Sequence, residues 1–182
     1  MRWNFVLACT LLLPVLAGCA STPGHTPGTP PEQAVRPAAW EPPPTTPVAE
    51  APVGEIDPAR LRDVLPAWED AARAWTPAPD VVRTIREARP ARVEIFFGAW
   101  CGDSAEHVPP LLAALRAAGN PRLGVLLVAL DRQKHEPEGR ARARGIERVP
   151  TVIVFRDGRE IGRVVETPRT TMDRDVAEIL AR

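Results

Sequence analysis

The chain has 182 residues with 23 basic and 23 acidic side chains, so its formal net charge at pH 7 is zero. Nearly all of the basic residues are arginine, Lys134 being the sole lysine, and they form no concentrated basic stripe. A balanced charge of this kind argues against a nucleic-acid partner.

The first 18 residues have the pattern of an export signal. Arg2 supplies a positive charge, and residues 5–17 form an apolar run that is too short to span a bilayer as a stable helix. Residues 16–19, Leu-Ala-Gly-Cys, resemble the cleavage box of bacterial lipoproteins. The resemblance implies cleavage before Cys19, a diacylglycerol thioether on its sulfur and an acylated amino terminus. Such an anchor is stable, because each buried CH₂ contributes about 0.8 kcal/mol.

An ordinary secretory signal followed by a chance cysteine is the alternative interpretation of Cys19. In lipoproteins of two-membrane bacteria, an aspartate just after the lipidated cysteine favours retention in the inner membrane. Ala20 takes that place here. We therefore expect the protein in the cell envelope, lipid-anchored to the outer membrane and facing the periplasm.

Residues 19–54 are expected to be the lipidated cysteine and a tether. Residues 20–54 hold ten of the chain's 22 prolines and few large apolar side chains, too few to offset the entropy of ordering. An extended, mobile segment is therefore predicted, able to hold a domain up to about 100 Å from the bilayer at roughly 3 Å per residue. Trp40 stands by itself in this segment, and we interpret it as incidental or weakly packed rather than as a docking point.

Residues 55–182 are long enough for one domain with a real core. Asp57 followed by Pro58 is a good helix start, and apolar residues continue at helical spacing until Thr76. These residues are Leu61, Val64, Leu65, Trp68, Ala71, Ala72 and Trp75. We expect them to pack on the domain, a cofactor or partner groove being the alternative. A second short helix is predicted over about residues 80–88.

The remaining pattern alternates between strands and helices. The predicted elements are a strand at 92–97, a helix at 101–118, a strand at 123–130, a short helix at 137–144, strands at 151–155 and 160–165, and a helix at 171–180. The continuous apolar run 123–130 is typical of a strand buried on both faces, and Asp157-Gly158 predicts a hairpin turn. The order predicts an α/β fold: a central mixed sheet of about four strands flanked by helices, with an extra N-terminal amphipathic helix.

With these elements placed, residues 80–182 resemble the thioredoxin superfamily. Residues 100–102, Trp-Cys-Gly, match its active-site run, and Pro109 falls where the family has a proline in the active-site helix. Residues 149–151, Val-Pro-Thr, match its cis-proline loop, and residues 155–158 match the segment that leads into the last hairpin. The resemblance implies a thioredoxin-like fold and a reacting thiol at Cys101.

The candidate site residues follow from this resemblance. We predict catalytic roles for Cys101, Ser104 and Trp100, and client binding by Val149, Pro150, Gly102 and Asp103. Cys101 lies where a strand ends and a helix begins, so orphan backbone N–H groups and the helix macrodipole favour its thiolate. In the family, a cis proline exposes the backbone at the position of Val149, and an extended client pairs with it.

Several departures from the family's dithiol pattern lie near Cys101. Ser104 replaces the second cysteine, Ile95 occupies the place of a buried acid, and Leu127 occupies the place of a lysine. The machinery for moving a proton to and from a second sulfur is therefore missing together with that sulfur. Glu94 neighbours the acid position but points to the other side of the strand, where we expect a solvated carboxylate.

The cysteine count limits the chemistry. Cys9 leaves with the signal and Cys19 is consumed by lipid, so the mature chain keeps one thiol, Cys101, in an oxidising compartment. That thiol can form a mixed disulfide, but release needs the client's own second thiol or an external thiol. The Ser104 hydroxyl can donate a hydrogen bond to the thiolate, whereas the Asp103 charge opposes it.

Three functions compete at this stage. The first is thiol–disulfide exchange through Cys101, the second is a redox-silent module that binds an envelope protein, and the third is a peroxidase-like or metal-carrying role. The third is disfavoured, because His107 lies six rather than four residues after Cys101 and is interpreted as a surface histidine. Neither a cofactor nor a metal is expected, and the partners are protein thiols and disulfides or small thiols. A monomer is expected, and the arginines at 140, 142 and 144 are interpreted as a solvated face rather than an anion or glutathione site.

Overall fold

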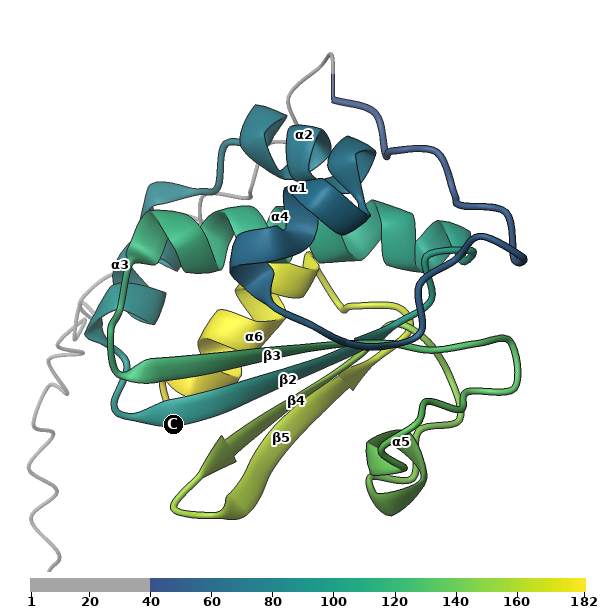
Figure 1. Cartoon of the computed structure of the whole chain (residues 1–182). Helices are drawn as coiled ribbons and strands as arrows, with labels where there is room; N and C mark the ends of the chain where they lie inside the picture. The colour runs from purple at the N-terminus through teal and green to yellow at the C-terminus, as the bar shows by residue number, and fades with distance from the viewer. Residues whose placement is uncertain (1–39) are drawn as a thin grey trace, which may run out of the picture. The chain divides into compact units, whose positions relative to one another are not determined.

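The computed structural model describes residues 40–182, and the predictions for the signal, Cys19 and the first part of the tether lie outside the described residues. A five-stranded mixed sheet forms the centre of the described chain (Figure 1). Its strands lie in the order β1-β3-β2-β4-β5, with β2 and β3 parallel and the other neighbours antiparallel. The strands are β1 (Gly54–Ile56), β2 (Ala91–Phe97), β3 (Leu123–Ala129), β4 (Thr151–Arg156) and β5 (Arg159–Val165).

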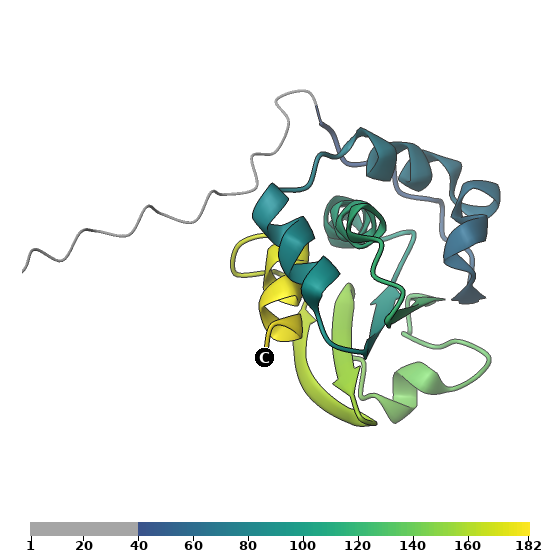
Figure 2. The same ribbon diagram turned by 90° about the vertical axis from the view of Figure 1, so that its left-hand side faces the viewer.

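Most helices lie on one face of this sheet. The helices are η1 (Pro58–Arg60), α1 (Leu61–Val64), α2 (Pro66–Ala74), α3 (Pro79–Glu87), α4 (Gly102–Ala118), α5 (Arg140–Ala143) and α6 (Met172–Leu180). The two views in Figures 1 and 2 place α3, α4 and α6 on one side of the sheet and α5 on the other. The predicted α/β class with a mixed sheet flanked by helices is confirmed. The fifth strand, β1, was not predicted, because three residues are too few for an alternating pattern.

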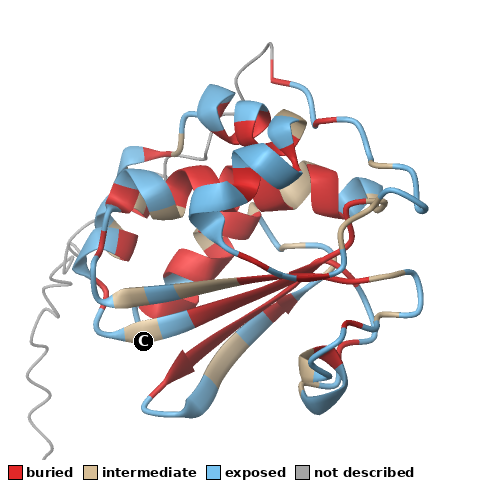
Figure 3. Cartoon of the chain, in the orientation of Figure 1, coloured by how far each residue is buried: buried red, intermediate tan, exposed pale blue. Residues whose placement is uncertain are grey.

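Alternation along β2 divides the core into two layers. Val93, Ile95 and Phe97 pack with the helical layer of α3, α4 and α6, whereas Phe96 packs on the opposite face with Ala141 of α5. This is the period-two geometry of a strand. Figure 3 shows the buried residues concentrated in α4 and along the central strands. The site at the end of β2 therefore rests on a strand that is packed from both sides.

The predicted N-terminal amphipathic helix is broken into η1, α1 and α2. Its expected start is confirmed, because the Asp57 carboxylate accepts a hydrogen bond from the Ala59 backbone N–H at 2.9 Å. The break comes at Leu65, whose φ of −136° and ψ of 69° are not helical. Pro66 follows it, and a proline lacks an N–H and disfavours a helical conformation at the residue before it. Trp68 still packs inward, 5.2 Å from Phe97 between ring centroids.

Trp40 is docked on the domain, so our interpretation of it as incidental or weakly packed is wrong. The indole is 7% exposed, its Nε1–H donates to the Ala71 carbonyl at 3.0 Å, and its ring meets that of Trp75 edge-on at 5.1 Å. The Thr46 backbone N–H also donates to the Ala99 carbonyl at 2.9 Å. A single indole can bury a large apolar area while its N–H is hydrogen-bonded. The proline-rich composition of residues 20–54 as a whole gives no sign of one such side chain.

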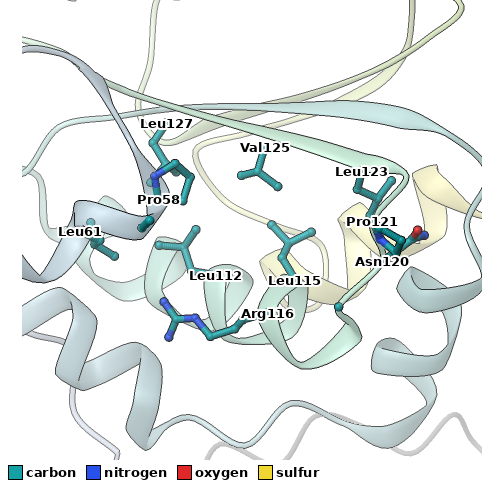
Figure 4. A pocket seen from close by; sticks show the side chains of 12 residues that line it. Pro58, Leu61, Leu112, Leu115, Arg116, Asn120, Pro121, Leu123, Val125 and Leu127 are labelled. Carbon is teal, nitrogen blue, oxygen red and sulfur yellow. The ribbon is translucent and has the colours of Figure 1, made fainter.

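The strand β3 is buried on both faces only in its C-terminal half. Leu123 and Val125 are partly exposed, because η1 and the C-terminal half of α4 leave an apolar cavity of about 370 Å³ over them (Figure 4). The cavity lies at the end of α4 that is opposite to Cys101. The continuous apolar run therefore overstated the burial of this strand.

The remaining boundaries agree with the predictions to within a few residues. The helix α4 ends at Gly119, which has a left-handed φ of +56°, and the predicted hairpin turn is present at Asp157 and Gly158, both with positive φ. Within residues 40–182, every helix is too short or too polar to cross a membrane.

Candidate functional site

Cys101 is the N-cap residue of α4, in extended conformation with φ −98° and ψ 127°. Its backbone N–H donates to the Gly98 carbonyl at 2.9 Å, which closes the turn between β2 and α4. The thiol is partly exposed. The predicted position at a helix start is therefore confirmed, and the positive end of the dipole of α4, a helix of 17 residues, lies at the residue that carries the sulfur. The Cys101 side chain accepts no capping hydrogen bond from the first turn of α4.

The loop that carries Val149 and Pro150 lies directly beside this thiol. The Val149–Pro150 peptide bond is cis, and Cys101 Sγ donates to the Val149 carbonyl oxygen at 3.5 Å. Two motifs that are 48 residues apart in the chain thus meet at one sulfur atom. The side chains of Val149 and Pro150 are buried, so a client that binds here would use the main chain.

Hydrogen bonds hold this loop in place from both sides. The Thr151 hydroxyl donates to the Arg148 carbonyl at 2.7 Å, and the Glu166 backbone N–H donates to the Pro150 carbonyl at 2.6 Å. The Arg148 guanidinium pairs with the Glu166 carboxylate at 2.8 Å. The backbone next to the thiol is therefore positioned by β4 and by the end of β5, not by the loop itself.

Trp100 forms one wall of the site. Its Nε1–H donates to the Leu130 carbonyl at 2.8 Å, which ties the indole to the end of β3. The ring lies against Gly98, where an added Cβ would come within 2.6 Å of it. Arg132 and Lys134 lie near the ring, with their charged groups 5.1 Å and 5.7 Å from its centroid.

Ser104 lies beneath the site and has no exposed surface. Its hydroxyl oxygen accepts a hydrogen bond from the Gly98 backbone N–H at 3.2 Å. The contact in the structure is thus with the turn that precedes Cys101, and donation from Ser104 to the thiolate stays a prediction. Gly102 and Asp103 are both exposed on the first turn of α4.

Comparison with known proteins finds thioredoxins. The chain is 36% identical over 70 residues to thioredoxin from Chlamydia trachomatis and 34% identical over 70 residues to thioredoxin from Chlamydia caviae. Each match covers 38% of this chain and 63% of the relative, so the chain spans slightly less than two thirds of the relatives' length. No family model matches the chain.

Among solved structures, an HIV epitope scaffold superimposes with a TM-score of 0.50 at 17% identity, covering 70% of this chain and 91% of that one. The fold is thioredoxin-like. The comparisons support the thioredoxin superfamily at this level.

The neighbouring sheet positions Ile95, Leu127 and Val152 are apolar. Ile95 lies opposite Leu127 on β3 and opposite Val152 on β4, and none of the three has exposed surface. The resemblance placed an acid and a lysine of dithiol enzymes at the first two of these positions. Their adjacency in the sheet agrees with that assignment, and both are hydrocarbon here.

Glu94 is not the solvated carboxylate that we expected. It is 2% exposed and accepts two hydrogen bonds from the Arg144 guanidinium, at 2.9 Å and 3.2 Å, with Arg92 at 2.9 Å. Both arginines also lie over the Phe155 ring, with their guanidinium carbons 5.2 Å (Arg92) and 4.4 Å (Arg144) from its centroid. Because α5 has only four residues, these side chains cover part of the second sheet face.

The arginines at 140, 142 and 144 therefore do not form a single solvated face. Arg144 is bound to Glu94, and Arg140 pairs with Glu55 at 2.9 Å, whereas Arg142 is exposed. Since Arg140 and Arg144 are paired with carboxylates, their charges are balanced without a bound anion. Long side chains that bridge different elements cannot be assigned from spacing on a short helix.

A second buried acid, Asp173, was missed in the sequence. It lies in the first turn of α6 with no exposed surface, and burial raises the pKa of its carboxyl group despite the nearby Thr171 and Arg174. Neither carboxylate oxygen has a donor in hydrogen-bonding geometry. In the sequence, it looks like an ordinary acidic residue at a helix start, so no signal distinguished it.

His107 is half-buried rather than fully exposed. It lines a small cavity of about 220 Å³ together with Trp40, Trp75 and Met172. Across residues 40–182, no three histidine, cysteine or acidic side chains are grouped so that they could hold a metal ion.

Proposed function

We propose that this protein is a lipid-anchored, thioredoxin-like monothiol of the bacterial cell envelope that exchanges disulfides through Cys101. The observation that carries the proposal is the position of Cys101 Sγ: partly exposed at the start of α4, and 3.5 Å from the Val149 carbonyl of the cis-proline loop. A thiolate at a helix N-terminus is stabilised, and the thiolate is the species that attacks disulfides.

The exchange step balances without a cofactor. The Cys101 thiolate attacks one sulfur of a client disulfide, a new S–S bond forms, and the old S–S bond breaks. The leaving sulfur takes the electron pair and then a proton from solvent. Cys101 is thereby oxidised to the mixed disulfide, and one client thiol is released in reduced form.

Release of the client then depends on a second thiol from outside the domain. Ser104 stands where a resolving cysteine would stand, and Ile95 and Leu127 offer no group that moves a proton. Attack by another thiol of the client on the mixed disulfide expels Cys101 as its thiolate and leaves the client with a rearranged disulfide. Where Cys101 has instead attacked the small-thiol sulfur of a client–small-thiol disulfide, the client leaves reduced, and attack by a second small thiol expels the Cys101 thiolate and joins the two small thiols in a disulfide. The protein would act as an isomerase in the first case and as a mixed-disulfide reductase in the second.

Alkylation of Cys101 tests the proposal. We expect folded protein to react with iodoacetamide at neutral pH faster than the same protein unfolded in urea, with modification assigned to Cys101 by peptide mass. Mixed disulfides trapped with cellular proteins should vanish in Cys101→Ser. A folded thiol that reacts no faster than the unfolded one would argue against exchange.

The second candidate is a redox-silent binding module. It is favoured by the buried Ser104, engaged with Gly98, and by the apolar sheet positions Ile95 and Leu127. Under this proposal Cys101→Ala retains its envelope partner in affinity capture, with or without reductant. Loss of that partner in Cys101→Ala would remove the candidate.

The anchor is a separate part of the proposal. It is supported by the run Leu-Ala-Gly-Cys at residues 16–19 and by Ala20 after it. Growth with a labelled fatty acid should label the full chain, Cys19→Ser should lose the label, and fractionation should place the wild type in the outer membrane. If the wild-type chain stays unlabelled, residues 1–18 are an ordinary secretory signal and Cys19 carries no lipid.

A further inference from the structure

Two cations lie at the ring of Trp100, next to the reacting sulfur. The guanidinium carbon of Arg132 is 5.1 Å from the ring centroid and Lys134 Nζ is 5.7 Å from it. Both distances lie within the range in which a cation is attracted to an indole face. Trp100 directly precedes Cys101, so the two charges lie at the ring of the residue next to the one that carries the thiol.

The segment after β3 holds these cations in place. Lys134 Nζ donates to the Arg132 carbonyl at 3.0 Å, and the Lys134 backbone N–H donates to the Asp131 carbonyl at 3.0 Å. The Asp131 carboxylate accepts the His135 backbone N–H at 2.8 Å. The Trp100 indole is itself bonded to Leu130. Both cations thus belong to a hydrogen-bonded turn, in which the Lys134 ammonium is itself bonded to the backbone and Arg132 is exposed.

The other sides of the site carry different charges. Asp103 and Glu106 on the first turns of α4 are acidic, Asp103 being exposed and Glu106 half-buried. On the cis-proline loop, Arg148 is paired with Glu166 at 2.8 Å. The Trp100 side carries two cations, Arg132 and Lys134, in a turn that also holds the Asp131 carboxylate, so its net charge is positive.

We propose that Arg132 and Lys134 select clients that carry acidic side chains next to the disulfide that Cys101 attacks. The inference rests on the proposed function and names its client class. Complementary charge speeds the approach of a partner and disfavours partners of like charge. A glutamate or aspartate close to the client cysteine meets the two cations, whereas a lysine or arginine there is repelled.

The probes are synthetic peptides whose single cysteine is joined by a disulfide to thionitrobenzoate. The acidic peptide has glutamates beside the cysteine, the basic peptide has lysines, and a neutral one has glutamines. Attack by Cys101 releases coloured thionitrobenzoate, so the second-order rate is read directly from absorbance. Each rate is divided by that of 2-mercaptoethanol with the same peptide, and the background of Cys101→Ser is subtracted.

For the full chain we expect the acidic peptide to react about threefold to tenfold faster than the basic peptide at low ionic strength. The ratio should fall toward one as salt screens the charges. Arg132→Gln with Lys134→Gln should bring the ratio close to one, and Arg132→Glu with Lys134→Glu should invert it. The matched control is Arg89→Glu, which should leave the ratio unchanged. Arg89 is exposed and lies just before the first residue of β2, whereas Cys101 follows the last residue of that strand.

The outcomes separate this inference from the proposed function. Equal rates for acidic and basic peptides at a reactive Cys101, or a preference that survives the double charge reversal, overturn the inference and leave exchange standing. If no peptide modifies Cys101 while 2-mercaptoethanol reacts with the same peptides, the proposed function fails and the inference fails with it.

Discussion

Replacement of Trp40 by alanine tests whether the proline-rich segment belongs to the folded domain. The indole is 7% exposed, and aromatic side chains of this kind bury roughly 150–250 Å². At about 25 cal/mol per Å² this corresponds to roughly 4–6 kcal/mol as an upper limit. Release of the segment that joins Trp40 to β1 returns conformational entropy, which offsets part of the loss. We therefore expect Trp40→Ala to lower the free energy of unfolding by about 2–4 kcal/mol.

Urea denaturation followed by circular dichroism measures this change, with the midpoint and the m value fitted together. The matched control is Val48→Ala in the same segment, where the side chain is 47% exposed and a change within about 0.5 kcal/mol is expected. A double-mutant cycle of Trp40→Ala with Trp75→Ala should show a coupling of about 0.5–1.5 kcal/mol from the edge-on rings. If Trp40→Ala matches the control, the segment is a free tether and the docking described above is wrong.

Three further predictions concern the buried acids and the site. Glu94→Gln should lower the free energy of unfolding by about 1–3 kcal/mol in urea titrations, because Arg144 loses its charged partner. The control Glu178→Gln, in an exposed pair, should change it by less than about 0.5 kcal/mol. Equal effects would mean that burial of Glu94 is unimportant for stability. Burial raises the pKa of Asp173, so the folded state holds its proton more tightly than the unfolded state and wild type loses stability as pH rises from about 4. Asp173→Asn should remove that loss, its advantage growing with pH until the raised pKa is passed, and a pH-independent difference would contradict the assignment. Ser104→Cys should gain slow disulfide reductase activity, measured by insulin reduction, because the new thiol can expel the client from Cys101. The activity should be slow, since Ile95 cannot accept the proton of that thiol. A folded but inert variant would show that the site does not support exchange.

Local patterns determined the order of elements and the identity of the site. Helix starts and ends at Asp57 and Gly119, and the hairpin turn at Asp157, depend on contacts within a few residues, so they could be predicted. The meeting of Cys101 with Val149 was predicted only through the resemblance, because no spacing rule links positions 48 residues apart. The helix ends and the hairpin turn are thus encoded by short motifs, in which the residue type favours the backbone conformation directly.

Only the tertiary structure decided where polar and aromatic side chains find their partners. Glu94 was expected to be solvated because it points to the other side of the strand from Ile95, and Trp40 was interpreted as incidental or weakly packed because it stands by itself in a proline-rich segment. Arg144 and Trp75 nevertheless reach them from other elements. Asp173 became buried because α6 packs against α3 and α4. The two cations at Trp100 likewise depend on a turn that follows β3. Burial and pairing are properties of the assembled layers, and a one-dimensional pattern records only which residues are available for them.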